Sequence, residues 1–133
     1  MSSVAPVARK LLLRRRLLQL TAFVFALGAL LSLLDADDMA DGMGFFLNGV
    51  NGYSQFYASV VGVWLATACL ALLAARHGQQ PILGDVTAMF VLAQPAGRLI
   101  AAIPYGLPQG FLLLMCAVEL AGGCLLLALR SAP

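Results

Sequence analysis

Charged residues are scarce in this sequence of 133 residues: they make up 11% of the chain, whereas soluble domains carry roughly a quarter. Hydrophobic residues account for 62%. This balance excludes an ordinary soluble globular protein. It also excludes a disordered chain, because disorder requires low hydrophobicity and high charge density. The class that remains is an integral membrane protein.

Several functional signatures are also missing. The net charge of +2 is too small for a nucleic-acid-binding protein, so no nucleic-acid partner is expected. The three cysteines lie inside apolar runs, which argues against a disulfide framework. A lone His77 has no second ligand, and the Asp37–Asp41 segment is explained as a solvated acidic loop, so we expect no metal. Without a phosphate-binding loop or a Ser-His-Asp set, we expect no cofactor and no enzyme.

Long apolar runs dominate what is present. Each is close to the roughly 20 residues that a helix needs to cross a bilayer, and none alternates with the period of barrel strands. The sequence therefore predicts an all-α integral membrane bundle of four transmembrane helices, a single membrane domain over residues 1–133. The predicted spans are residues 17–34, 56–75, 86–103 and 111–129. The stretch from Asp35 to Gln55 is expected to lie over the outer mouth of the bundle.

Basic residues set the predicted orientation. Lys and Arg collect in cytoplasmic loops, and with the N-terminus inside, every one of them except Arg98 falls on the inner side. The sequence thus predicts a multi-pass protein of the bacterial inner membrane with both termini cytoplasmic. A cleaved signal peptide is the alternative for the first run, but the run is too long and lacks a cleavage site.

Small residues recur at every fourth position in the second and third spans. Such stripes allow helix backbones to approach closely, and packing holds membrane helices together. We expect both stripes to face neighbouring helices. They consist of Ala58, Gly62 and Ala66, and of Ala93, Gly97 and Ala101.

Two charges lie inside predicted spans, Arg98 in the third and Glu119 in the fourth. An unpaired charge there costs at least about 3 kcal/mol. The short turn between these spans makes them antiparallel, and a rise of about 1.5 Å per residue puts the two α-carbons within roughly 5 Å in depth. We therefore predict an Arg98–Glu119 ion pair.

Polar neighbours suggest a pocket around this pair. Gln94 lies one turn from Arg98, and Pro95 removes a backbone donor from the third span. The further residues expected to line the pocket are Tyr57, Tyr105 and Cys116. Two readings stay open: the pair binds a ligand, or it only fixes helix register.

Motifs in the second half of the chain resemble a known family. Gly97-Arg98-Leu99, Tyr105-Gly106-Leu107-Pro108 and Glu119 are similar to short bacterial four-helix membrane proteins known as domain of unknown function 4345. The resemblance covers about residues 48–129. In Gln55-Phe56-Tyr57-Ala58-Ser59, glutamine stands where the family usually has arginine, and alanine and serine replace paired glycines. The resemblance implies the fold and the ion pair, but no reaction.

Three functions fit these observations. The first is a non-enzymatic scaffold or accessory subunit, whose small-residue stripes dock to a second copy or to a larger membrane complex. The second is a binder or carrier of a lipid, quinone or other amphipathic molecule at Arg98, Glu119 and Gln94. The third is an enzyme with Glu119 as general acid or base, which lacks a second catalytic group. Membrane lipids are partners in each case.

Overall fold

A computed structural model describes residues 4–130, which form helices and connecting turns without a strand in that range. Four helical stretches, with the continuous run Gly49–Arg76 counted as one, are long and apolar enough to cross a membrane, which confirms the predicted class. The helices are α1 (Val4–Leu34), α2 (Ala36–Gly42), α3 (Gly49–Phe56), η1 (Tyr57–Gly62), α4 (Val63–Arg76), α5 (Pro81–Tyr105) and α6 (Phe111–Ala128).

Helix α1 is longer than the apolar run that predicts it. It begins at Val4 rather than at Leu17, because Pro6 fits a first helical turn and no further proline interrupts the helix. It ends at Leu34, and the side chain of the next residue, Asp35, accepts a hydrogen bond from the Asp38 amide at 3.0 Å and so caps α2. The basic residues Arg14 to Arg16 consequently belong to the helix itself.

The segment between the first two spans is partly helical. Helix α2 buries Ala40, and Met43 follows it into the core. The hydroxyl of Tyr53 in α3 donates to the Asp37 carboxylate of α2 at 2.6 Å. The helix of the second span begins at Gly49 rather than at Phe56, after a turn in which Gly49 has a φ of +60°.

The second span contains a wider π-helical turn. Helices α3, η1 and α4 follow one another directly, and η1 supplies the π turn at Tyr57–Gly62. This turn places Val60 and Val61 in the core, one turn before the buried Trp64. Such insertions re-aim the side chains that follow them and are frequent at functional sites.

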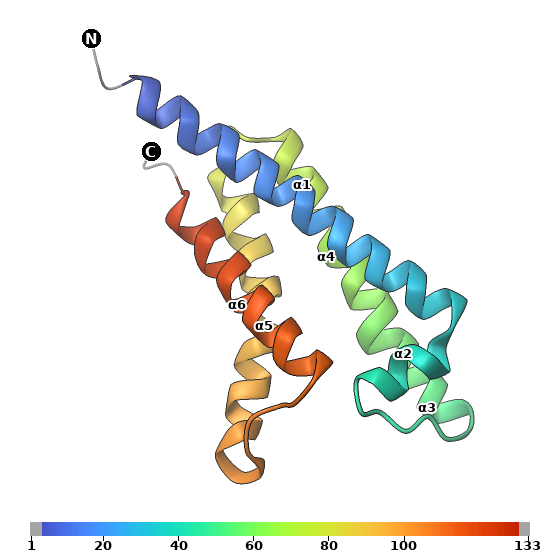
Figure 1. Ribbon diagram of the computed structural model, residues 1–133. Helices are drawn as coiled ribbons and strands as arrows, with labels where there is room; N and C mark the ends of the chain where they lie inside the picture. The colour runs from blue at the N-terminus through green and yellow to red at the C-terminus, as the bar shows by residue number, and fades with distance from the viewer. Residues whose placement is uncertain (1–3, 131–133) are drawn as a thin grey trace.

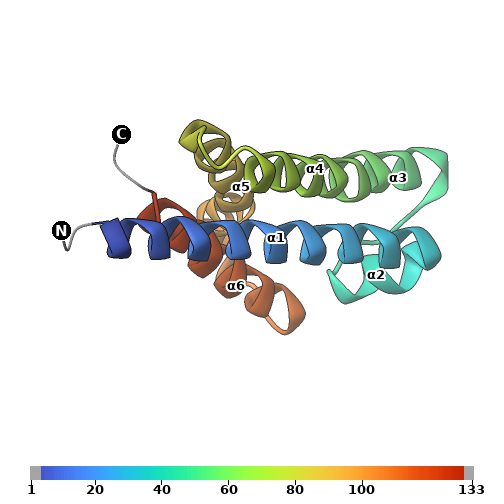
Figure 2. The same cartoon turned by 90° about the horizontal axis from the view of Figure 1, so that it is seen from above.

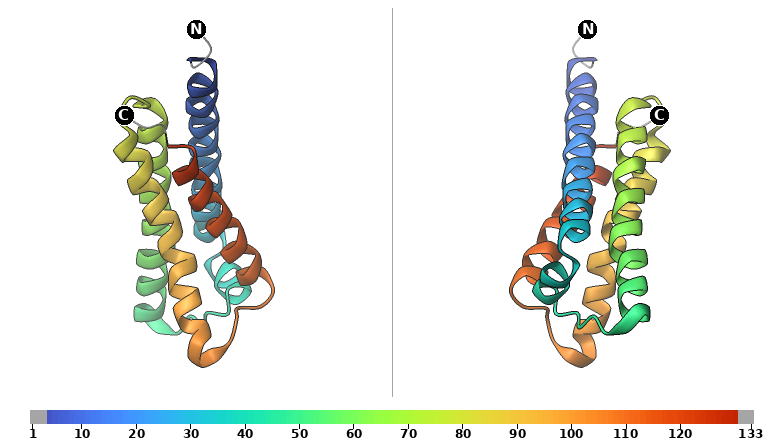
Figure 3. Two further views of the ribbon diagram at one scale, coloured as in Figure 1. Left: turned by 90° about the vertical axis from the view of Figure 1, so that its left-hand side faces the viewer. Right: turned by 90° about the vertical axis from the view of Figure 1, so that its right-hand side faces the viewer.

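The long helices pack as two pairs, α1 with α4 and α5 with α6. The pairs join along α4 and α5, whereas α1 and α6 touch only sparsely. Figure 1 shows the two pairs together at the end where the chain begins and ends, and spread apart toward α2. Seen from above, α5 and α6 cross the direction of the α1–α4 pair (Figure 2). The bundle therefore has one weakly closed side, between α1 and α6 (Figure 3).

Small residues mediate the close packing, but they are not the predicted ones. All six residues of the two stripes named above are exposed. The interface of α4 instead uses Thr67, Ala68, Ala71, Ala74 and Ala75, and that of α5 uses Gly84, Thr87 and Ala88. The prediction that the stripes face neighbouring helices is therefore wrong within this chain. The same four-residue spacing of small residues also occurs on the buried faces, as Ala71 and Ala75 in α4 and as Gly84 and Ala88 in α5.

Helices α5 and α6 interlock. A Cβ atom built at Gly123 of α6 would collide with the Leu92 side chain of α5, so any larger residue there would force Leu92 to move. Helix α5 continues through Pro95 and Pro104. Proline within a membrane helix is tolerated where neighbouring groups satisfy the freed carbonyl.

Candidate functional site: an ion pair beside an apolar groove

The structure brings together the three polar residues that the sequence singles out. The Arg98 guanidinium of α5 donates through Nη1 to Oε2 of Glu119 in α6, and through Nη2 to Oε1 of Gln94 at 3.4 Å. Both charged side chains are largely buried, with 16% of Arg98 and 8% of Glu119 exposed. The short turn between α5 and α6 places the two charges at matching depths, so each neutralises the other inside the bundle.

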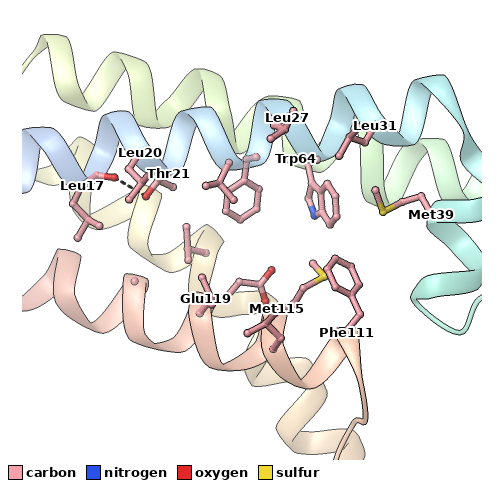
Figure 4. A pocket seen from close by; sticks show the side chains of 17 residues that line it. Leu17, Leu20, Thr21, Leu27, Leu31, Met39, Trp64, Phe111, Met115 and Glu119 are labelled. Atoms are coloured by element: carbon pink, nitrogen blue, oxygen red, sulfur yellow. Dashed lines mark hydrogen bonds between the residues drawn. The ribbon is translucent and has the colours of Figure 1, made fainter.

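An apolar groove lies beside the ion pair, and Glu119 is one of its lining residues. It has a volume of about 380 Å³ and runs between α1, α4 and α6. Its walls are α1 from Leu17 to Leu31, Met39 and Trp64, Val91 of α5, and α6 from Phe111 to Gly122. Figure 4 shows these side chains converging from opposite helices on one space. The groove follows from the sparse contact between α1 and α6.

Few polar groups reach this groove, and one is already satisfied within its own helix. The Thr21 hydroxyl donates to the Leu17 carbonyl at 2.9 Å. The Glu119 carboxylate forms part of the wall and is turned toward the groove in Figure 4. The Trp64 indole Nε1 is buried and has no hydrogen-bond partner among the residues that the structure describes. A buried donor without an acceptor costs free energy.

Packing fixes the orientation of Trp64. A Cβ atom at Gly28 of α1 would lie 2.7 Å from Cζ3 of the indole, so the ring lies directly on the glycine. The Phe25 ring meets the indole edge to face, with centroids 6.1 Å apart. Trp64 is not among the residues that the sequence analysis above singles out. The signal that could find it is a lone tryptophan at mid-span, since an N–H there needs an acceptor.

The other residues predicted around the ion pair lie outside the apolar groove. Tyr57 lies on η1 with 38% of its surface exposed, and Tyr105 is 88% exposed at the end of α5. Cys116 is buried on α6. None of the three is among the residues that line the apolar groove.

A second group of charges, the terminal ion cluster, consists of Arg14, Asp85 and Arg130. Arg14 Nη2 lies 2.5 Å from Asp85 Oδ1, and Arg130 Nε lies 3.0 Å from Asp85 Oδ2. Arg14 also donates to the Pro81 carbonyl at 3.3 Å. Asp85, which lies on α5, thereby connects this helix to α1 and to Arg130, which follows α6. Sequence reasoning counts Arg14 only as a cytoplasmic charge and overlooks Asp85, an acid near the start of an apolar helix.

Gly84 makes room for this cluster. A Cβ atom there would lie 2.8 Å from Cζ of Arg14, inside contact distance. Arg14 is only 6% exposed although three arginines follow one another at this point of the chain. The absence of a side chain at Gly84 therefore lets a guanidinium pack against α5.

Four membrane-length helices with ionisable groups paired between them define a multi-pass helical membrane protein. The family model of the domain of unknown function DUF4345 matches residues 13–130, and the chain belongs to this family. The match extends beyond the resemblance noted above, and it includes α1 from residue 13 onward and both groups of charges. Neither a curated protein nor a solved structure matches the chain.

Proposed function

We propose that this protein is a non-enzymatic binder of an amphipathic small molecule, which it holds in the apolar groove with the polar part of the ligand beside Glu119. The observation that carries the proposal is an apolar groove of about 380 Å³ with one side of a buried ion pair in its wall. Ligand sites are typically apolar cavities of about 300–1,000 Å³ with a few polar groups that fix orientation.

The groove is accessible from the hydrocarbon region. Many of its lining side chains are also exposed on the surface of the chain, among them Leu20, Val24, Leu31, Leu114 and Val118. A ligand dissolved in the bilayer can therefore reach the groove laterally, between α1 and α6. An acyl chain, an isoprenoid chain or a hydrophobic ring would replace bulk lipid along these walls.

The proposal includes the predicted location in the bacterial inner membrane, with both termini cytoplasmic. The terminal ion cluster and the basic residues of α1 then lie at the cytoplasmic end, consistent with the preference of Lys and Arg for that side. The groove follows most of the first predicted span, from Leu17 to Leu31. A reporter fused after Pro133 that proved extracytoplasmic would contradict this orientation.

The test is to fill the groove without disturbing the fold. Gly122 lines the groove, and a Cβ atom there meets nothing within 4 Å among the described residues. Gly97 is likewise open but lies outside the groove, so Gly97→Leu is a matched control for Gly122→Leu. The wild type and both variants are purified from native membranes in a mild detergent, and copurifying small molecules are identified by mass spectrometry.

The expected result is an amphipathic molecule that is present in the wild type and in Gly97→Leu, but lost from folded Gly122→Leu. An identical lipid profile in all three proteins would overturn the proposal. Apolar substitution of the pair, Arg98→Leu with Glu119→Met, should also remove the ligand if the pair contacts it.

A second candidate function is that of an accessory subunit of a membrane complex. The specific observation is that both small-residue stripes are exposed, one on η1 and α4 and the other on α5. Gly97→Leu places a bulky side chain in one stripe without an internal clash. Loss of a stoichiometric protein partner from this variant, with the groove ligand retained, would support the accessory role.

A further inference from the structure

The unsatisfied polar groups of the groove constrain the chemistry of its occupant. The argument rests on the proposed function, because it specifies which amphiphile the groove takes. Trp64 is 5% exposed, and its Nε1 donor has no acceptor among residues 4–130. Backbone carbonyls of neighbouring turns are engaged in helices, so an acceptor for this donor has to arrive with a ligand.

Glu119 supplies a hydrogen-bond acceptor that complements the Trp64 donor. The only hydrogen-bond donor that the described chain brings to its carboxylate is the Arg98 guanidinium, on Oε2. The carboxylate also lines the groove. Its second oxygen can therefore accept a hydrogen bond from a group inside the groove. The site thus offers one donor, on α4, and one acceptor, on α6 (Figure 4).

The net charge of the site and its depth in the membrane further limit which headgroup the ligand can carry. Because Arg98 compensates Glu119, the site is electrically neutral before a ligand binds. An anionic headgroup would stand beside a carboxylate, and a cationic one would compete with Arg98. Glu119 lies halfway along α6 and Trp64 near the middle of the Gly49–Arg76 span, at a depth where a charged headgroup is costly.

We propose that the groove selects an uncharged amphiphile bearing a hydroxyl group, which accepts a hydrogen bond from Trp64 and donates one to Glu119. A hydroxyl is both donor and acceptor, whereas an ester, ether or quinone carbonyl only accepts. Long-chain alcohols, isoprenoid alcohols and diglycerides belong to this class. Phospholipids and ionised fatty acids do not.

The chain carries its own probe for this site, because Trp64 is its single tryptophan. The full-length protein is reconstituted in phosphatidylcholine nanodiscs and titrated with amphiphiles that carry bromine atoms on a C18 chain, which quench tryptophan fluorescence on contact. The four probes are the dibrominated alcohol, its methyl ether, the corresponding fatty acid and a dibrominated phosphatidylcholine. The methyl ether keeps the acceptor for Trp64 and lacks the donor for Glu119.

The expected result is that the alcohol quenches Trp64 at about one-tenth of the concentration that the ether or the acid requires, since a hydrogen bond to a charged group is lost. This preference should vanish in the Arg98→Leu/Glu119→Met variant, which retains Trp64. The Trp64→Phe variant removes the donor and keeps an aromatic ring. It should retain less alcohol than the wild type by native mass spectrometry.

Two other outcomes separate this inference from the proposed function. Equal quenching by all four probes, reduced alike in Gly122→Leu, would mean that the groove binds amphiphiles without hydroxyl selection, which overturns the inference alone. Quenching that is the same in the wild type and in Gly122→Leu would mean that the probes reach Trp64 from the surrounding bilayer and not by binding in the groove. That result would overturn both proposals.

Discussion

The two groups of buried charges have opposite effects on the shape of the bundle. The terminal ion cluster links α1, α5 and Arg130 after α6, so three parts of the chain meet at one end. The Arg98–Glu119 pair links only α5 and α6, which are already neighbours in sequence. Where charges join distant helices, the bundle is closed. Where they join adjacent ones, α1 is left without a polar tie and the groove opens.

The largest effect is expected from removing the shared acid of the terminal ion cluster. Asp85→Ala leaves Arg14 buried without its carboxylate and releases Arg130. Breaking a buried ion pair from one side costs about 3–5 kcal/mol. Unfolding midpoints in detergent should fall markedly for this variant and stay constant for Asp41→Ala, whose site on α2 is exposed. Equal midpoints for the two variants would contradict the role assigned to the cluster.

The second pair should be less costly to break, because it holds two helices that also interlock at Gly123. Arg98→Leu strands the Glu119 carboxylate and is expected to cost about 3 kcal/mol. Adding Glu119→Met should restore most of this loss, since an apolar replacement of both partners removes the unpaired charge. Denaturant titrations of the single and double variants measure the difference. A double variant no more stable than the single one would be inconsistent with a simple two-residue pair.

A steric change near the terminal ion cluster should have an intermediate effect. Gly84→Ala places a methyl group 2.8 Å from Cζ of Arg14, within a buried and paired guanidinium. Overpacking of this kind costs about 1–3 kcal/mol. Gly97→Ala, on the same helix with nothing within 4 Å among described residues, should lose no stability. The comparison is read from thermal unfolding, and a loss of equal size in Gly97→Ala would contradict the steric explanation, because alanine is the better helix former.

The smallest effect on stability is expected in the groove itself. Gly122→Leu should shift the free energy of unfolding by less than about 1 kcal/mol, because glycine is already a poor helix former and the added side chain meets open space. The same variant should nevertheless lose its amphiphile. A large drop in its unfolding midpoint would show that α1 approaches α6 more closely than the described contacts indicate.

Sequence reasoning reaches the features that depend on local length and depth. The four apolar helices follow from apolar runs, and the contact of Arg98 with Glu119 follows from a short turn and a constant rise per residue. The helix of the second span begins at Gly49, earlier than its apolar run, because polar residues such as Asn51 and Ser54 are compatible with a helix at the membrane boundary.

Features that depend on how helices pack are beyond this reasoning. The stripe that contains Gly62 and the one that contains Gly97 have the spacing of an interface, yet both are exposed, because Trp64 and its neighbours decide which face of α4 turns inward. The groove depends on the sparse contact between α1 and α6, which no local pattern encodes. Asp85 escapes notice because its partners come from opposite ends of the sequence.

The terminal ion cluster also fixes one end of α5 to α1, so a small rotation there displaces the far end of α5. With α5 tied to α1 at its first turns through Asp85, its 25 residues extend over about 37 Å at 1.5 Å per residue. A rotation of about 5° around the tied end therefore moves the far end of α5 by roughly 3 Å, close to the radius of a hydrocarbon chain, while the cluster itself stays intact. The angle between the helix pairs at this tied end therefore bears on how thick a molecule the open side of the bundle can admit.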